Sequence, residues 1–267
     1  MSQDRPSDPA SAAQLASPSY RLAALDQDFL LGESMRGVRF LLEFAKADEA
    51  LQAWGVRSTI VVFGSARVRE DGVEGQARWY AQARRFGQIV SERGGAIRPV
   101  DGVRDNVIAT GGGPGLMEAA NRGACEIGAP SIGFNITLPH EQQPNPYTTP
   151  DLTFRFHYFA MRKMHLAMRA NALVAFPGGF GTFDELFELL TLRQTDKAPR
   201  IPVVLFDEAY WRSVINFEAL VEHGMVAAAD LELFQFAETA EAVWEALVAG
   251  GVKPCASIEL EAEQAKP

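Results

Sequence analysis

The residues best suited to chemistry lie in the segment Pro177–Thr182, Pro-Gly-Gly-Phe-Gly-Thr, which is followed by Glu185. The apolar run Ala172–Phe176 precedes it and helical periodicity begins at Phe183, so the pattern predicts a strand, a tight turn and a helix. Glycines let the backbone approach a ligand closely, and the N–H groups at the positive end of a helix attract an anion. The segment is therefore predicted to bind phosphate. The alternative is a capping box, in which Thr182 and Glu185 only satisfy backbone donors.

A second glycine-rich turn, Thr110–Gly115, follows the predicted strand Asn106–Ala109 and opens a helix. Two such turns at equivalent strand-to-helix junctions favour a ligand site more strongly than one. Neither turn matches a Walker loop or the dinucleotide Gly-x-Gly-x-x-Gly pattern, which disfavours NTP hydrolysis and NAD chemistry. A third strand end carries Ser65 and Arg67, which either supply a hydroxyl and a cation to a phosphate or only shape a turn.

The alternation of β-rich and helical runs predicts an α/β fold with a doubly wound parallel sheet flanked by helices. The expected strands are Thr59–Phe63, Asn106–Ala109, Ser131–Ile136, Leu152–Phe156, Ala172–Phe176, Ile201–Phe206 and Leu233–Phe236. Helices are expected over about 75–93, 116–127, 158–170, 183–192, 211–222 and 239–248. The expected organisation is a disordered tail over 1–19, a helical extension over 20–57, the α/β domain over 58–250 and a frayed tail over 251–267.

Composition narrows the function classes. The 267 residues carry a formal charge of -9, so the chain as a whole does not suggest binding to nucleic acid or to an anionic membrane. The two cysteines, Cys125 and Cys255, suggest neither a disulfide framework nor a zinc site, and the four histidines show no metal-ligand spacing. The start lacks the pattern of a secretory signal, and no apolar run reaches the ~20 residues of a membrane span. A cytoplasmic location is expected.

Two further segments could contribute to the site. The predicted helix from Tyr158 carries Arg162 and Arg169 seven positions apart, on one face, with His165 near it. This cationic face could counter a phosphate, or it could simply be solvated. The polar loop Thr137–Pro150 has the length of a lid or a base-recognition loop, although an ordinary surface connection fits its composition equally well.

These motifs together resemble the Lonely Guy (LOG) family of Rossmann-like proteins, which are often mislabelled lysine decarboxylases. The family signature Pro-Gly-Gly-x-Gly-Thr-x-x-Glu is complete from Pro177 to Glu185. The Gly-Gly-Gly-Pro-Gly-x-Met-Glu landmark occupies Gly111–Glu118, and the Arg-Lys pair is Arg162-Lys163. Small members carry Met-x-x-Arg-Lys, whereas Phe159 takes the first position here. With this departure and its helical extension, the chain resembles the longer bacterial branch of the family.

The resemblance implies hydrolysis of the N-glycosidic bond of a purine nucleoside 5′-monophosphate, either AMP or a cytokinin-type nucleotide, to free base and ribose 5-phosphate. It implies Arg162 and Glu185 as the catalytic pair, with Arg162 holding the phosphate or stabilising the departing base. The implied phosphate and ribose contacts are Gly178, Gly179, Gly181, Thr182, Gly111, Gly112, Gly113 and Ser65. Glu118 and Lys163 are secondary candidates, and Glu118 could equally be a favourable charge at a helix start. The resemblance also implies a homodimer, no cofactor and no metal.

Two other functions compete with this one. A pyridoxal-phosphate decarboxylase needs a Schiff-base lysine, and Lys163 is the lysine in the candidate site, without a recognisable pyridine-binding signature. A non-catalytic carrier of a nucleotide or of the molybdenum cofactor needs the glycine loops but not the pair of Arg162 and Glu185. The presence of that pair favours an enzyme.

Overall fold

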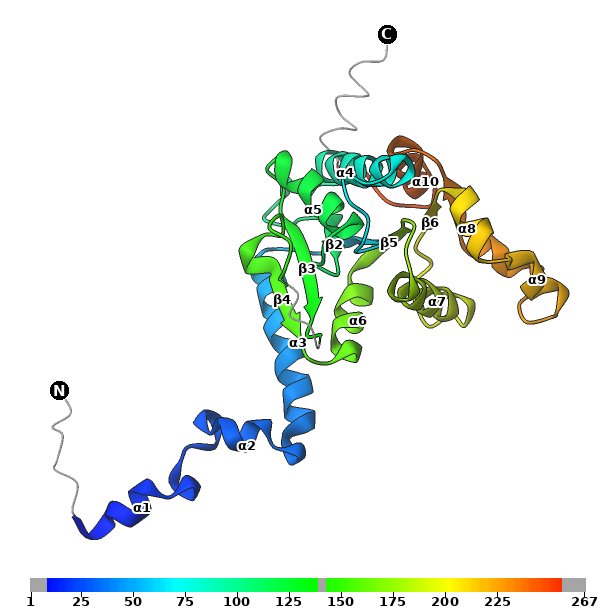
Figure 1. Ribbon diagram of the computed structural model, residues 1–267. Coiled ribbons are helices and arrows are strands. Elements are labelled where there is room, and N and C mark those ends of the chain that lie inside the picture. The colour runs from blue at the N-terminus through cyan, green and yellow to red at the C-terminus, as the bar shows by residue number, and fades with distance from the viewer. Residues whose placement is uncertain (1–8, 139–142, 256–267) are drawn as a thin grey trace. The chain divides into compact units, whose positions relative to one another are not determined.

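The structure is a computed structural model, and it describes residues 9–138 and 143–255 (Figure 1). The chain forms two compact units that meet between Ala45 and Lys46, inside the helix α3 (Arg36–Ala53). The first unit contains α1 (Ala12–Ala16), α2 (Gln27–Leu31) and the start of α3. It also contains the short 3₁₀ helices Pro9–Ser11, Pro18–Tyr20, Ala23–Leu25 and Glu33–Met35.

The second unit is built on one sheet of seven strands in the order β4-β3-β2-β1-β5-β6-β7. The strands are β1 (Thr59–Phe63), β2 (Val107–Thr110), β3 (Ser131–Ile136), β4 (Thr153–Phe156), β5 (Ala170–Ala175), β6 (Val203–Phe206) and β7 (Gln235–Ala237). Every neighbouring pair is parallel, so all the carboxyl ends lie at one edge. Chain order reverses at β1, which lies between β2 and β5. This confirms the Rossmann-like, doubly wound α/β fold.

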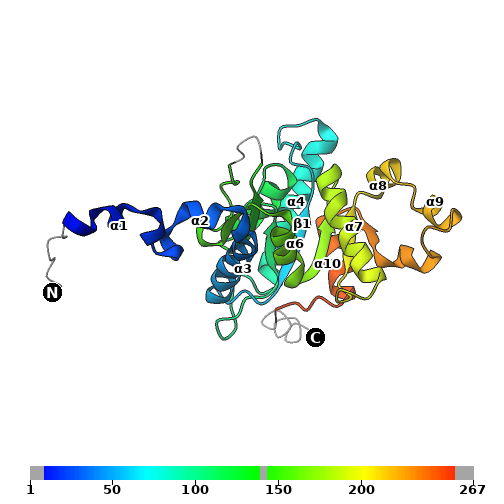
Figure 2. The ribbon, with the colours of Figure 1, turned by 90° about the horizontal axis from the view of Figure 1, so that it is seen from below.

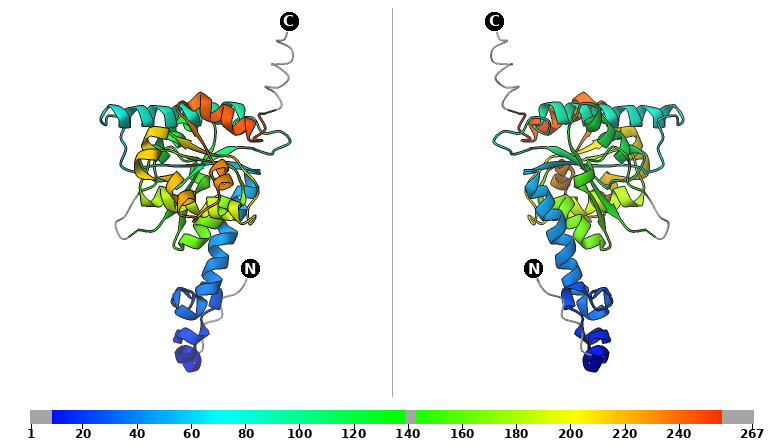
Figure 3. Two further views of the ribbon diagram at one scale, coloured as in Figure 1. Left: turned by 90° about the vertical axis from the view of Figure 1, so that its right-hand side faces the viewer. Right: turned by 90° about the vertical axis from the view of Figure 1, so that its left-hand side faces the viewer.

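Helices cover both faces of the sheet. The face packed against α4 (Glu74–Arg93), α5 (Leu116–Glu126) and α10 (Ala240–Ala249) lies opposite the face packed against α6 (Phe159–Met168) and α7 (Phe180–Gln194) (Figures 2 and 3). The C-terminal turns of α3 also belong to this second face, where Ala47 and Leu51 are buried. The three-layer arrangement leaves the loops at the two strand edges as the places where a ligand can reach the backbone.

Most predicted elements are confirmed within a residue or two, and one is wrong. The run 211–222 was expected to be one helix, but it forms α8 (Glu208–Val214) and α9 (Phe217–Glu222). The break occurs because Ile215 is extended and Asn216 caps the second helix, its side chain accepting from the Ala219 N–H. The tail predicted to be disordered over 1–19 contains α1; residues 1–8 lie outside the described part of the chain.

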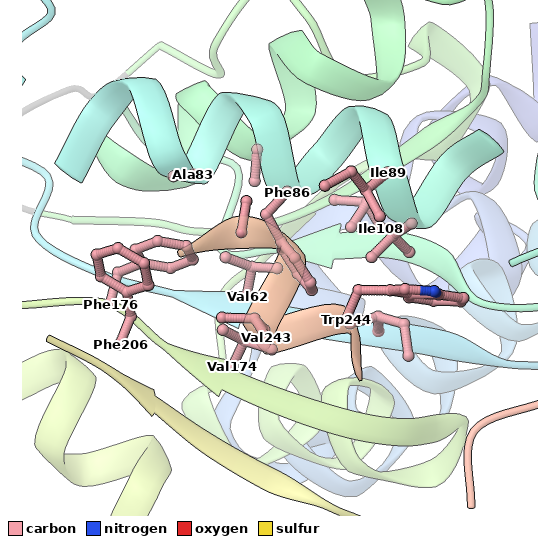
Figure 4. Close-up of a cluster of buried hydrophobic side chains, with 14 of the residues drawn as sticks. Val62, Ala83, Phe86, Ile89, Ile108, Val174, Phe176, Phe206, Val243 and Trp244 are labelled. Carbon is pink, nitrogen blue, oxygen red and sulfur yellow. The ribbon is translucent and has the colours of Figure 1, made fainter. Parts of the chain in front are cut away.

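The core under α4 and α10 is a continuous aromatic and aliphatic cluster (Figure 4). It includes the stacked pair Phe176, which follows β5, and Phe206, which ends β6, with ring centroids 4.7 Å apart. Phe86 of α4 approaches Phe176 from above the sheet, at 6.3 Å between centroids. Phe176 precedes the loop between β5 and α7, and Phe206 precedes the turn between β6 and α8 (Glu208–Val214). Because both rings are buried in the core, the starting points of these two connections are fixed.

Substituting Phe206→Ala is expected to lower the free energy of unfolding by about 3–5 kcal/mol, because a fully buried ring is replaced by a cavity. The matched change Phe180→Ala removes a ring that is 92% exposed and should cost less than about 1 kcal/mol. Urea unfolding of both variants measures this, and equal losses would contradict the packing described here.

Candidate active site

A cavity of about 770 Å³ opens at the carboxyl edge of the sheet, where the order of strands reverses. Its walls come from the loops after β1, β2 and β5, including Ser65, Gly111 and Gly178. In open α/β sheets this switch point is where ligands bind. A second hollow of equal volume lies among the loops that precede the strands, near Ser58 and Asn171, and contains neither glycine loop. The first cavity is therefore the candidate site.

The loop between β5 and α7 has its carbonyl groups occupied. The Ser65 N–H donates to the Pro177 carbonyl at 2.9 Å, and the Tyr210 hydroxyl donates to the Gly178 carbonyl at 2.5 Å. The Gly179 carbonyl accepts the first bonds of α7, from residues 182 and 183, at 2.9 and 3.0 Å. These bonds hold the loop from three sides.

The N–H groups of residues 178–181 have no acceptor among the residues that the structure describes. All four residues line the cavity, at the N-terminus of a helix of 15 residues. Unpaired N–H groups and the positive end of the helix dipole make this wall of the cavity suitable for an anion.

The capping-box alternative is wrong. The N-cap of α7 is Gly179, and no side chain forms a capping hydrogen bond at the start of this helix. Thr182 is the third residue of the helix and therefore cannot be its N-cap. Glu185 does not reach back to the helix start; its carboxylate pairs with Arg162 of α6. Thr182 is buried and packs against Gly178. A Cβ added to Gly178 would lie 2.1 Å from the Thr182 hydroxyl oxygen.

The second glycine loop closes against the loop after β1. Gly115 has a φ of +75°, and a Cβ there would lie 2.2 Å from the Ser65 carbonyl oxygen, which also accepts from the Leu116 N–H at 3.0 Å. The Ser65 hydroxyl accepts from the Arg67 N–H at 3.1 Å, so it shapes this turn while lining the cavity. Helix α5 begins at Leu116, after both Pro114 and Gly115.

The buried ion pair of Arg162 and Glu185 joins α6 to α7 beside the cavity. The Arg162 Nη2 atom lies 2.5 Å from the Glu185 Oε1 atom, and the two residues are 8% and 7% exposed. Arg162 lines the cavity, with its guanidinium 5.5 Å from the Phe159 ring centroid, whereas Glu185 lies behind it. The Arg162 Nε is buried with no acceptor among the described residues. The pair thus retains an unused donor.

Burial raises the pKa of Glu185 to about 7, and the positive charges of Arg162 and Lys163 oppose this shift. A carboxyl group with this pKa can exchange a proton near neutrality. Among the described lining residues of the cavity, the charged side chains are Arg67 and Arg162, with no carboxylate. The cavity wall is therefore cationic in a chain of net charge -9.

Several predicted residues do not line the cavity: Gly112, Glu118, Lys163, His165 and Arg169. Lys163 pairs with Asp184 and Glu188 of α7, at 2.8 and 2.7 Å. Glu118 accepts from the Tyr80 hydroxyl at 3.1 Å, on the side of α4.

The prediction that Arg162, His165 and Arg169 form one cationic face is wrong. Arg169 follows the last turn of α6, pairs with Asp48 at 2.6 Å and lines the hollow before the strands. His165 is buried, stacked on Phe134 at 6.0 Å between centroids, so it belongs to the core. Arg162 alone of these three faces the candidate site.

The loop expected as a lid divides in two. Leu138 lines the cavity, and residues 139–142 lie outside the described part of the chain. Asn145 is buried: its N–H donates to the Gly112 carbonyl at 2.9 Å and its amide to the Gly113 carbonyl at 3.1 Å. This half of the loop supports the second glycine turn.

Sequence reasoning missed the wall formed by Trp79 and Tyr210, which comes from α4 and α8. The available signal was Asp207, an acidic residue at a strand end that begins a helix, which is typical of an N-cap. Nothing in the sequence indicated that Tyr210 would reach across to Gly178.

The chain is similar to several known proteins. A family model described as "possible lysine decarboxylase" matches residues 117–247. The chain is 27% identical over 139 residues to the cytokinin riboside 5′-monophosphate phosphoribohydrolase LOG3 of Arabidopsis thaliana, covering 51% of this chain and 63% of that protein. The chain fits the LOG family.

A probable phosphoribohydrolase of the same kind from Oryza sativa subsp. japonica is 27% identical over 138 residues, covering 51% of this chain and 59% of that protein. The chain thus spans about three fifths of the length of these LOG relatives.

Two solved structures are similar to the chain at low identity. The structural genomics target TM1055 has 20% identity and a TM-score of 0.49, covering 70% of this chain and 96% of its own. A molybdenum cofactor binding protein from Rippkaea orientalis has 19% identity and a TM-score of 0.45, covering 73% and 95%. At these values neither structure bears on what this chain binds or does.

The described residues contain neither a metal-binding cluster nor a membrane-spanning helix. Within 9–138 and 143–255, no group of three or more histidines, cysteines or carboxylates is placed to hold a metal ion. In the same ranges, no helix has both the length and the apolarity needed to cross a bilayer.

Substituting Gly178→Ala is expected to lower the free energy of unfolding by about 1–3 kcal/mol, because the new methyl group would overlap Thr182 and crowd the Ser65 N–H. The neighbouring change Gly179→Ala meets no atom within 4 Å and should change it by less than about 1 kcal/mol. Equal stability of the two variants in urea unfolding would show that Gly178 is not held against Thr182.

Glu185 should make stability depend on pH. Its folded-state pKa of about 7 exceeds the ordinary 4.5, so its stabilising contribution is complete below pH 4.5 and is lost as the pH rises through 7. From pH 5 to pH 8, the wild type should lose about 2–3 kcal/mol relative to Glu185→Gln, which does not titrate. Urea unfolding at both pH values measures this, and parallel pH profiles would exclude the raised pKa.

Proposed function

We propose that this protein hydrolyses the N-glycosidic bond of a purine nucleoside 5′-monophosphate, releasing the free base and ribose 5-phosphate. The observation that carries the proposal is one helix serving two tasks: unpaired N–H groups at the start of α7, and the buried pair of Arg162 and Glu185 one and a half turns further on. A 5′-phosphate and the glycosidic bond of the same nucleotide are separated by one ribose, so both can lie in one cavity.

The phosphate end of the substrate is assigned to the loop of residues 178–181. The unpaired N–H groups, the helix dipole and the cation Arg67 all favour an anion there. Gly111, Gly113 and Ser65 line the other walls, toward the ribose and base. With the phosphate bound by backbone groups, Arg162 is left for the reacting bond.

Hydrolysis breaks the C1′–N bond through an oxocarbenium-like state, in which positive charge grows on the sugar and negative charge on the base. Arg162, whose Nη1 lies beside Gly111 in the cavity wall, donates to the departing base. Water adds to C1′; its hydroxyl stays on the sugar and its second proton goes to the base. Glu185 orients Arg162, and with a pKa of about 7 it is suited to passing that proton.

A pyridoxal-phosphate decarboxylase is disfavoured by the same cavity. That chemistry needs a lysine amine at the reacting carbon. No lysine lines the described walls of the cavity, and Lys163 is engaged by two carboxylates of α7.

A homodimer is part of the proposal. Phe159, Met164 and Met168 of α6 and Phe187 of α7 are 51, 44, 51 and 37% exposed, and Phe159 also lines the cavity. Exposed apolar side chains gathered on adjacent helices favour contact with another protein surface. A second copy of the chain would cover them. The proposed location is the cytoplasm, where nucleoside monophosphates are formed and consumed.

The test is release of free base from a panel of nucleoside 5′-monophosphates, with the nucleosides as controls. The wild type should release base and ribose 5-phosphate from at least one monophosphate. Glu185→Gln keeps a partner for Arg162 and should lose about 10²–10⁴-fold in kcat while still binding nucleotide. Glu188→Gln, the same change one turn later on the side of Lys163, should keep the wild-type rate.

Equal rates for Glu185→Gln and the wild type would exclude the catalytic role of Glu185. Binding of monophosphates without release of base from any of them would make a nucleotide carrier the correct account.

A further inference from the structure

The phosphate loop is held by a residue from a different strand-to-helix connection. After β6, Asp207 adopts a φ of +69°, which is uncommon for a residue other than glycine. Its carboxylate caps α8 by accepting from the Tyr210 N–H at 3.0 Å. The cap fixes the first turn of α8, and Tyr210 lies in that turn.

The same carboxylate ties this turn to α4. The second oxygen of Asp207 accepts from the Trp79 indole N–H at 2.7 Å and from Arg78 at 3.1 Å, and Asp207 is 8% exposed. The Trp79 and Tyr210 rings then meet edge to face, with centroids 5.5 Å apart. The Tyr210 ring is thereby held from two sides, next to the cavity.

From this position the Tyr210 hydroxyl donates to the Gly178 carbonyl oxygen at 2.5 Å. The peptide bond is planar and trans, so the Gly178 carbonyl and the Gly179 N–H point in opposite directions from one rigid unit. Fixing the direction of the carbonyl therefore fixes the direction of the Gly179 N–H. Glycines on both sides leave this peptide unit with little other restraint against rotation.

We propose that Tyr210 is a positioning residue, held by Asp207 and Trp79, which locks the peptide between Gly178 and Gly179 so that its N–H binds the 5′-phosphate. The inference rests on the proposed function only in taking the anion at this loop to be a nucleotide phosphate. Without the Tyr210 hydroxyl, this peptide can rotate so that its carbonyl oxygen faces the phosphate. The partial negative charge of that oxygen would repel the phosphate.

Two observations fit this role. Burial raises the pKa of the Tyr210 hydroxyl, so it remains a donor throughout the neutral range. The neighbouring carbonyls of Pro177 and Gly179 have backbone donors of their own, whereas the Gly178 carbonyl depends on this side chain.

The test compares Tyr210→Phe with Tyr80→Phe, which removes a buried hydroxyl bonded to Glu118 outside the cavity. Isothermal titration with ribose 5-phosphate should give a Kd about tenfold higher for Tyr210→Phe and unchanged for Tyr80→Phe. Adenosine, which lacks the phosphate, should bind the wild type and Tyr210→Phe equally. Asp207→Asn keeps an oxygen for the cap but loses the charge, and should weaken ribose 5-phosphate binding by a smaller factor.

An unchanged Kd for ribose 5-phosphate in Tyr210→Phe would overturn the proposal, as would an equal loss for adenosine, which would indicate a general structural role. If Tyr210→Phe fails to fold, the Asp207→Asn titration decides the question in the same way. Base release by the wild type is measured separately, so phosphate binding that depends on Tyr210 without any turnover would refute the proposed reaction and leave this inference standing.

Discussion

The loop after β1 packs closely against the loops after β2 and β5 at the carboxyl edge of the sheet. A Cβ on Gly115 would lie 2.2 Å from the Ser65 carbonyl oxygen, and a Cβ on Gly178 would lie 3.1 Å from the Ser65 backbone nitrogen. The backbone at Ser65 therefore contacts both glycine loops. In the loop after β5, the carbonyl groups accept hydrogen bonds from within the protein, whereas the N–H groups of residues 178–181 have no acceptor among the described residues. These N–H groups line the cavity and are available to an anion.

The electrostatics of the site follow from that arrangement. A buried arginine and a buried glutamate are costly to desolvate unless they pair, and Arg162 and Glu185 pair at 2.5 Å. Burial also raises the pKa of Glu185, so the pair combines a fixed cation with a proton-exchanging acid. Lys163, the next residue of α6, pairs with Asp184 and Glu188 and does not line the cavity. Adjacent residues on α6 thus have separate tasks.

The sequence was sufficient to predict the sheet and two of the loops that line the cavity. The strands have strong apolar runs, and glycine turns at the ends of two of them predicted where a phosphate would bind. Local patterns could not predict contacts between distant segments, such as Tyr210 with Gly178 or Asp207 with Trp79. The error at Arg169 has the same origin. Helical periodicity placed it near Arg162, but α6 ends before it, and Asp48 of α3 binds it at the hollow that precedes the strands.

The most direct measurement is a ¹⁵N NMR titration of the protein with ribose 5-phosphate, following the amide resonances of residues 178–181. The account predicts the largest shifts at these four N–H groups, saturating with a single binding constant, and small shifts in the hollow near Ser58 and Asn171. Saturable shifts centred on that hollow, or none at residues 178–181, would contradict the claim that the start of α7 binds the phosphate.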